Sequence, residues 1–302
     1  MKTLFRLLSS FLSLLLMLSP VAQAQDLKEL RFGVLPVPSE SPEELSSAFQ
    51  AIADAVGKQL NVPAKVFVSP SYNALIEGLG ANRLDVAFVG GEQYVLAREQ
   101  GIALTPLVQV VHSGRNFYKS QVIVRADSPI RRVEDLKAKT FAFVSPSSAS
   151  GGLAPLLMLE RAGVKPADLK RALYTGNHEA SFLAVKNGKV DAAGVADQYW
   201  NIWKKAGLVN FGSYDMHSGA LQGGDIRIVQ SLDVPEAGIV ARDALGQAML
   251  ERMRAALVAV PKSAFGDRGF VGNFDRFVAS SDSTYEPVRA MRKLISSQPK
   301  RN

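Results

Sequence analysis

Four segments of the chain combine hydroxyl, amide or ring-nitrogen donors with small residues where an apolar run meets a helical pattern. The richest is Ser145–Gly152, which reads SPSSASGG; the others are Ser69–Asn73, Gly90–Tyr94 and Thr175–Glu179. Free backbone amides at a helix N-terminus attract an oxyanion, hydroxyls add neutral donors, and glycine lets the backbone approach a ligand. These residue types favour the binding of a small anion.

Each segment also has an ordinary structural interpretation. Ser145–Gly152 alone fits a helix N-cap with loop serines, and His178 fits a surface or capping residue. Tyr72 and Tyr118 fit packing at a domain edge as well as contact with a ligand. The recurrence of such loops where strands end favours the anion site, in which His178 would donate a hydrogen bond whether neutral or charged.

Motifs of catalysis and of metal or cofactor binding are missing from the sequence. There is no G-x-S-x-G nucleophile elbow, no G-x-x-x-x-G-K-[ST] phosphate loop and no cysteine. His178-Glu179 lacks the second histidine of a zinc H-E-x-x-H motif, and His112 and His217 stand in no pattern, so we treat them as structural. The sequence therefore predicts a binding protein with no catalytic residue, metal or cofactor.

Strand and helix patterns must position these loops, and they alternate along the chain. Leu30–Val37 is an apolar run suited to a buried strand, and Ser41, Pro42 and Glu44 then form the start of a helix predicted to reach about Gln59. The same rhythm restarts after Ser128-Pro129, with helices at Val133–Ala138 and Gly151–Ala162 among others. It predicts an α/β fold built on mostly parallel sheets.

The two halves of the chain repeat one pattern. EGLGANRLDVAFVG (Glu77–Gly90) and AVKNGKVDAAGVAD (Ala184–Asp197) both pass from a helix end through a turn into an apolar strand containing aspartate. Ligands bind beyond the carboxyl ends of such strands, so two facing sheets would enclose a cleft. Later, Ile226–Gln230 and Gly238–Ala241 are predicted strands, with a turn at Asp233–Glu236 between them.

The N-terminus predicts export of a chain of 302 residues. Lys2 and Arg6 precede an apolar run, and Ala22-Gln23-Ala24 supplies a cleavage site, so residues 1–24 are a predicted signal peptide. Its removal lowers the formal net charge from +7 to +5. The remaining charges are dispersed, which disfavours nucleic-acid binding. Without a cysteine to lipidate, we expect a soluble periplasmic protein, not a lipoprotein.

Two long segments together resemble a known family. YKSQVIVRADSPIRRVEDLKAKTFAFVSPSSASGGLAPLLML (Tyr118–Leu159) and TGNHEASFLAVKNGKVDAAGV (Thr175–Val195) are similar to signature segments of the phosphate/phosphite/phosphonate-binding components of ABC importers. Tyr72–Ala97 and Tyr285–Met291 also fit, so the resemblance covers essentially the whole mature chain.

The resemblance implies a type II periplasmic-binding-protein fold, in which two α/β lobes close on a ligand cleft by hinge bending. Lobe 1 would comprise residues 25–122 and 238–302, and lobe 2 residues 123–237. The strands that cross between the lobes would lie near Gln121–Arg125 and Gly238–Ala241.

Site residues are also carried over by position. The resemblance implies that the ligand is held by Tyr72, Tyr118, Ser148, Ser150 and His178, with the backbone N–H of Ala149. Ser148-Ala149-Ser150-Gly151 stands where the family usually has Ser-Thr-Ser-Gly, so one hydroxyl donor is absent.

A second departure concerns ligand specificity. Members that bind an aminoalkyl phosphonate are expected to place acidic groups near its ammonium, and this chain has Gln198 and Ala237 there, with Asp197 and Glu236 adjacent. This favours a compact phosphorus oxyanion: phosphite, phosphate or a small alkylphosphonate. The expected partner is a membrane ABC permease. The alternative is a sensor that passes the same signal to a membrane receptor kinase or cyclase.

Overall fold

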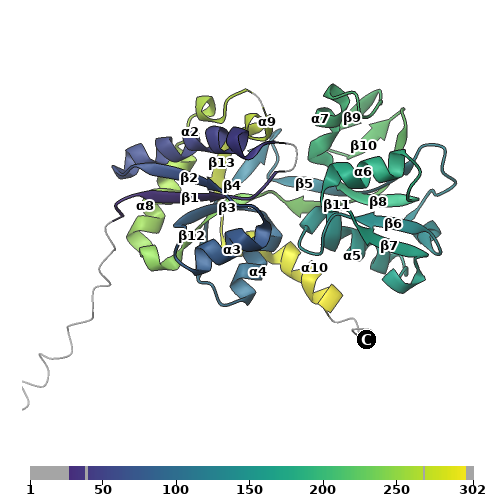
Figure 1. Ribbon diagram of the computed structural model, residues 1–302, viewed down its shortest axis with the longest axis horizontal. Coiled ribbons are helices and arrows are strands. Elements are labelled where there is room, and N and C mark those ends of the chain that lie inside the picture. The colour runs from purple at the N-terminus through teal and green to yellow at the C-terminus, as the bar shows by residue number, and fades with distance from the viewer. Residues whose placement is uncertain (1–26, 38–39, 268, 297–302) are drawn as a thin grey trace, which may run out of the picture.

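Two sheets flanked by helices form two lobes that lie side by side (Figure 1). The computed structural model describes residues 27–37, 40–267 and 269–296, so the predicted signal peptide lies outside the described residues. Strands and helices alternate through both lobes, which confirms the α/β fold class expected from the sequence.

The first lobe is built on a six-stranded sheet. Its spatial order is β13 (Phe274–Ala279), β4 (Leu104–His112), β12 (Gly238–Arg242), β3 (Val86–Val89), β1 (Leu30–Val34) and β2 (Ala64–Val68). Its helices are α2 (Pro42–Leu60), α3 (Tyr72–Gly80), α4 (Gly91–Glu99), α8 (Gln247–Val258) and the short α9 (Gly269–Gly272).

The first long helix forms for the reasons that its sequence gives. The Ser41 hydroxyl accepts a hydrogen bond from the Glu44 amide, and the Glu44 carboxylate accepts one from the Ser41 amide, so the predicted capping box is confirmed. The expected apolar face of α2 is buried in the core of the first lobe: Leu45, Phe49, Ile52, Val56 and Leu60. Burial of such a face is the main stabilisation of an amphipathic helix.

The second lobe is built on a five-stranded sheet. Its order is β11 (Ile226–Pro235), β5 (Phe117–Arg125), β8 (Ala192–Ala196), β6 (Thr140–Phe143) and β7 (Arg171–Tyr174). Its helices are α5 (Ala154–Arg161), α6 (His178–Lys186) and α7 (Trp200–Lys205), and β9 (Ser213–Asp215) pairs with β10 (Ala220–Gln222) in a separate hairpin. The helix expected at Val133–Ala138 is only a 3₁₀ turn over Val133–Leu136, and Ala138 has a left-handed φ of 58° that does not continue a helix.

Both sheets are mixed, which corrects the expectation of mostly parallel sheets. In the first sheet β1 pairs in parallel with β2 and β3, whereas β12 and β13 pair antiparallel with their neighbours. In the second, β5 is antiparallel to both β8 and β11. The alternation of strands and helices in the sequence predicts the parallel β-α-β units. It does not predict the direction of the strands next to the points where the chain passes from one lobe to the other.

The prediction of a turn at Asp233–Glu236 is also wrong for most of these residues. β11 continues through Asp233 and Val234 to Pro235, which is opposite Phe117 of β5. Proline lacks an N–H but is tolerated here, because β11 is an edge strand and Pro235 is its last residue.

The chain passes between the lobes twice. β4 belongs to the first sheet and β5, from Phe117 onward, to the second, so the first crossing lies at residues 113–116 and the expected boundary at residue 122 falls inside β5. Gln121–Arg125 is therefore a sheet strand of the second lobe. The second crossing lies between Pro235 and Gly238, and the two crossings are joined where the Glu236 amide donates to the Asn116 carbonyl at 3.0 Å.

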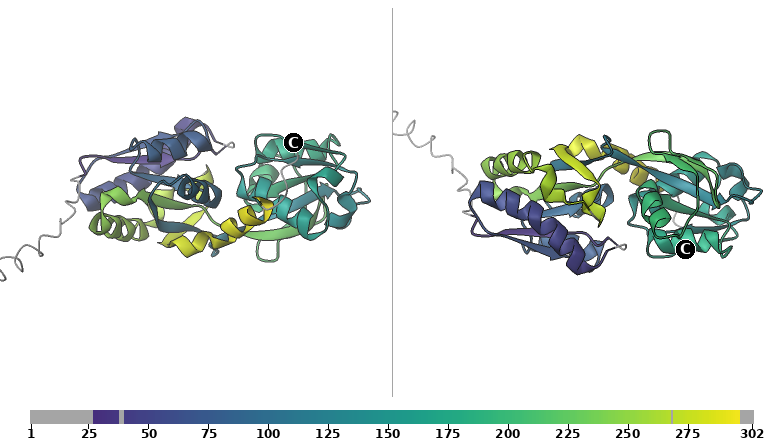
Figure 2. Two further views of the ribbon diagram at one scale, coloured as in Figure 1. Left: turned by 90° about the horizontal axis from the view of Figure 1, so that it is seen from below. Right: turned by 90° about the horizontal axis from the view of Figure 1, so that it is seen from above.

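The C-terminal helix α10 (Glu286–Ser296) adds a further link between the lobes. It leaves the first lobe and runs toward the second (Figures 1 and 2). Tyr285, Val288 and Met291 share one buried cluster with Leu153 and Leu157 of the second lobe.

Candidate ligand-binding site

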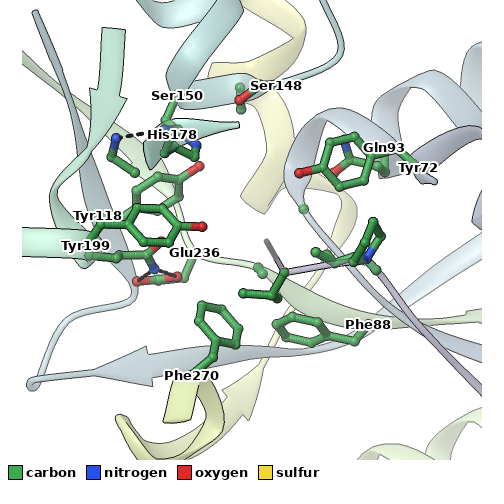
Figure 3. A pocket seen from close by; sticks show the side chains of 18 of the residues that line it. Tyr72, Phe88, Gln93, Tyr118, Ser148, Ser150, His178, Tyr199, Glu236 and Phe270 are labelled. Atoms are coloured by element: carbon green, nitrogen blue, oxygen red, sulfur yellow. Dashed lines mark hydrogen bonds between the residues drawn. The ribbon is translucent and has the colours of Figure 1, made fainter. Parts of the chain in front are cut away.

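A cavity of about 80 Å³ lies between the two lobes, and both lobes line it (Figure 3). All six residues that the resemblance assigned to ligand binding line this one cavity: Tyr72, Tyr118, Ser148, Ala149, Ser150 and His178. Each of the four loops singled out by their donors also reaches it, the second of them through Gly90 and Gln93. The segments that the sequence marked as ligand-binding thus converge on one place.

The serine loop follows β6 and opens the next helix with a wide π turn over Ala149–Leu153. Ser148 is the N-cap, and its hydroxyl oxygen accepts a hydrogen bond from the Gly151 amide at 3.0 Å. The amides of Ala149 and Ser150 begin the turn and so have no partner within it. Because π turns and open helix N-termini are both common at functional sites, this loop is suited to hold an oxyanion.

Gly151 is required for this loop to pack against its neighbours. A Cβ atom added to Gly151 would lie 2.3 Å from Val144 Cγ2 and 3.1 Å from His178 Cε1. Only glycine lets the loop backbone approach the end of β6 and the imidazole this closely.

His178 is the first residue of α6, which Asn177 caps by accepting from the Ala180 amide at 2.8 Å. The ring is buried, and burial lowers the pKa of His178 to about 4. Nδ1 accepts a hydrogen bond from the Ala196 amide at 3.1 Å, so in the neutral ring the proton must be on Nε2. His178 therefore offers the cavity a neutral N–H donor.

Three tyrosines border the cavity. Tyr72 comes from the start of α3, Tyr118 from β5, and Tyr199 from the 3₁₀ turn that precedes α7. Burial raises the pKa of each phenol, so each keeps its proton and can donate it in a hydrogen bond. Tyr199 also stacks on His178, with ring centroids 5.0 Å apart.

The far end of the cavity carries Gln198 and Glu236. The Gln198 amide nitrogen donates to both carboxylate oxygens of Glu236, at 2.9 Å and 2.8 Å, and His112 Nδ1 is 3.8 Å from the same carboxylate. Burial raises the pKa of Glu236. Glu236 is the one charged side chain among the described residues that line the cavity, and no lysine or arginine is among them. The hydrogen-bond donors that line the cavity are therefore uncharged.

Asp197, also expected near the ligand, lies outside the cavity lining. Its buried carboxylate accepts from the Lys119 amide at 2.9 Å and the Tyr214 hydroxyl at 3.0 Å, and lies 3.5 Å from the Arg115 guanidinium. Burial raises the pKa of Asp197. Within the turn Asp197–Tyr199, Gln198 and Tyr199 line the cavity. Asp197 lies outside the lining, and its carboxylate joins Arg115 of the first crossing to the second lobe.

Sequence reasoning missed the apolar wall. Phe88 and Phe270 lie on the side of the cavity opposite Ser148 and Ser150 (Figure 3), and Leu35, Pro36 and Val37 also line it. Phe88 lies in a run whose pattern predicts a buried strand, and Phe270 stands in a stretch with no ligand motif. The loop after the first strand could have been suspected, because it too lies beyond the carboxyl end of a parallel strand.

The residues that the structure describes offer neither a metal-binding cluster nor a membrane-spanning helix. No three histidine, aspartate or glutamate side chains there come together in a way that could hold a metal ion. Among the same residues, no helix has the length and apolar character needed to cross a membrane.

Comparison with known families decides the classification. The family described as the periplasmic substrate-binding protein of phosphonate ABC transporters matches residues 32–285, most of the chain. The chain belongs to this family. As a member it is a periplasmic substrate-binding protein of the phosphonate ABC-transporter type, which is a binding component and not an enzyme, as the sequence predicted.

Individual relatives agree with this family. The phosphate-import protein PhnD of Mycolicibacterium smegmatis is 28% identical over 87% of this chain and 85% of its own length. The phosphonates-binding periplasmic protein of Escherichia coli is 32% identical over 61% of this chain and 55% of its own. The solved structure of PhnD1 from Prochlorococcus marinus with methylphosphonate has a TM-score of 0.68 and 21% identity, covers 90% of this chain and 99% of its own, and shows the shared fold.

Proposed function

We propose that the protein captures a compact phosphorus oxyanion (phosphite, phosphate or a small alkylphosphonate) in the cavity between its lobes. The observation that carries this proposal is the convergence of neutral donors on one end of the cavity: the Ser148 and Ser150 hydroxyls, the Ala149 amide and the His178 ring. Preorganised neutral donors in a water-poor site stabilise an anion without a counter-charge.

The opposite end of the cavity supports a choice among such ligands. Phe88 and Phe270 favour a hydrogen or a small alkyl group on phosphorus over a further charged oxygen. A volume of about 80 Å³ is well below that of ordinary drug-sized pockets, so it suits a small ligand. Gln198 and Glu236 would select among ligands by the substituent that reaches them, and Asp197, outside the lining, has no part in this proposal.

Binding would shift the protein toward the closed arrangement, since donors from both lobes contact the same ligand. Bending would be confined to the two crossings, at residues 113–116 and 236–237. The loaded protein would then deliver its ligand to a membrane ABC permease. We further propose that residues 1–24 direct export to the periplasm and are removed there, without lipid attachment.

Calorimetry on the purified mature chain tests the ligand class. We expect binding of at least one of phosphite, phosphate and methylphosphonate, with weaker binding of aminoethylphosphonate and none of sulfate or nucleotides. A matching thermal shift should follow, because a ligand that binds only the folded state raises its stability. Failure to bind any phosphorus oxyanion would refute the proposal.

The alternative partner, a membrane receptor kinase or cyclase, uses the same binding module. Reconstitution separates the two possibilities. Ligand-dependent stimulation of an ABC permease's ATPase in proteoliposomes supports import, whereas stimulation only of a receptor kinase or cyclase supports sensing.

A further inference from the structure

Only part of the segment Gly90–Tyr94 faces the cavity, and its other residues contact the C-terminal part of the chain. Gly90 and Gln93 line the cavity, whereas Gly91, Glu92 and Tyr94 face the C-terminal helix. The segment opens α4 in the first lobe, and its side chains touch α10 and the serine loop of the second lobe. It therefore lies where three parts of the molecule meet.

Three contacts fix this segment against the C-terminal end of the chain. A Cβ atom on Gly91 would lie 2.9 Å from Val288 Cγ2, so glycine is needed for the close approach of α10. Glu92 is buried and pairs with Arg292 of α10. Tyr94 packs on Tyr285 with ring centroids 4.6 Å apart. The N-terminus of α4 is thus held firmly to α10.

From this fixed position, Gln93 reaches across to the other lobe. Its side-chain nitrogen donates to the backbone carbonyl of Ser147 at 2.8 Å, and Gln93 is only 5% exposed. Ser147 directly precedes Ser148, Ala149 and Ser150, the residues proposed to bind the anion. The bond therefore restrains the peptide group from which the anion-binding loop starts, and it links the two lobes directly.

Gly90 leaves space for the Gln93 side chain that makes this hydrogen bond. A Cβ atom on Gly90 would lie 2.5 Å from Gln93 Oε1, so the amide group of Gln93 lies against a residue that has no side chain. Leu153, the last residue of the π turn in the loop, belongs to the buried cluster that also contains Tyr285, Val288 and Met291 near the C-terminal end of the chain.

We propose that Gln93 is a positioning residue, which holds the anion-binding loop in its binding conformation through the Ser147 carbonyl before the ligand arrives. The loop is preorganised, so the ligand does not have to order it, and preorganisation strengthens binding. The predicted effect of Gln93 on ligand affinity rests on the proposed function. Its predicted effect on the mobility of the loop in the ligand-free protein does not.

The test compares Gln93→Met, which keeps the length of the side chain and removes the donor, with Gln100→Met at the C-cap of the same helix, where the residue is exposed. Hydrogen–deuterium exchange of the ligand-free mature protein is followed in peptides covering residues 144–153. We expect faster exchange there in Gln93→Met and unchanged exchange in Gln100→Met. If Gln93→Met does not fold, Gln93→Asn, which is too short to reach Ser147, replaces it.

Calorimetry with methylphosphonate and with phosphite completes the test. Loss of one buried hydrogen bond predicts that the Kd of both ligands rises by the same factor, about three- to tenfold. Unchanged exchange in residues 144–153 would overturn the proposal, and a rise in Kd for one ligand alone would assign Gln93 a direct ligand contact instead. If the wild-type protein binds neither of these ligands nor phosphate, the proposed function is refuted, and the exchange result alone decides the role of Gln93.

Discussion

The backbone amide of Ala196, at the end of β8, donates to Nδ1 of His178, at the start of α6, over 3.1 Å. This one bond selects the tautomer of a buried neutral imidazole and leaves Nε2–H as the donor facing the cavity. The contact between the end of β8 and the start of α6 thus fixes both the orientation of the His178 ring and the nitrogen that carries its proton.

The buried His178 predicts an acid-sensitive contribution to stability. The pKa of His178 is about 4 in the folded protein and about 6.5 in an unfolded chain, so the unfolded state binds the proton first as pH falls. Above pH 6.5 the residue contributes no pH dependence; between about pH 6.5 and 4 it destabilises the fold, by about 2 kcal/mol at pH 5. Urea unfolding at pH 7 and pH 5 should show a smaller loss of stability in His178→Gln than in the wild type.

The exposed His217 provides the control for this measurement, since His217→Gln removes a histidine without a burial effect. It should lose as much stability on acidification as the wild type. Equal losses in wild type and His178→Gln would contradict the assignment of a buried neutral ring.

The two loop serines should separate affinity from stability. Ser150→Ala removes a proposed donor to an anion, so Kd for methylphosphonate should rise about ten- to a hundredfold with little change in Tm. Ser148→Ala should also destabilise the fold by about 1 kcal/mol, because the Ser148 hydroxyl accepts from the Gly151 amide as an N-cap. Calorimetry and thermal melts measure both quantities, with the exposed Ser47→Ala as control. Unchanged Kd in Ser150→Ala would remove that hydroxyl from the site.

Features encoded locally could be predicted from the sequence, and the structure bears this out in particular residues. Ser41 and Glu44 cap α2 because the capping box needs only residues three apart. The SPSSASGG loop is recognisable in the sequence because its donors are contiguous. The order of the motifs along the chain then identified the family.

Features that depend on distant contacts could not be predicted. Phe270 reaches the cavity from a segment more than 180 residues beyond Phe88, and nothing near it in sequence marks a ligand. Asp197 and Gln198 are neighbours whose directions are decided by a 3₁₀ turn. The position of the first crossing depends on β5 pairing with β8 and β11, which the strand pattern at Gln121–Arg125 did not reveal.

Gly151→Ala should disturb both the loop and the fold. The added methyl group would lie 2.3 Å from Val144 Cγ2, and overpacking of this kind costs about 1–3 kcal/mol. Val144→Gly removes both atoms that are approached too closely, Cγ2 and the Cβ atom 2.5 Å from the added methyl group, so the double variant should be more stable than the sum of the two single effects predicts. Chemical denaturation of the four proteins of this cycle measures the coupling. Additive effects would show that the contact between Gly151 and Val144 does not limit the packing of the loop.

Glu236 should decide how the protein ranks ligands that differ in charge. Its carboxylate borders the cavity and is engaged by Gln198, so an anion that binds near it is repelled. Glu236→Gln should therefore strengthen binding of phosphite and methylphosphonate by about three- to tenfold. The same substitution should weaken binding of aminoethylphosphonate, whose ammonium group the carboxylate attracts. Glu43→Gln on the exposed start of α2 is the matched control and should leave both affinities unchanged. Calorimetry with the three ligands gives the ratio of their affinities. If the Kd values of all three ligands change by the same factor and in the same direction, Glu236 affects the cavity as a whole and does not select the substituent.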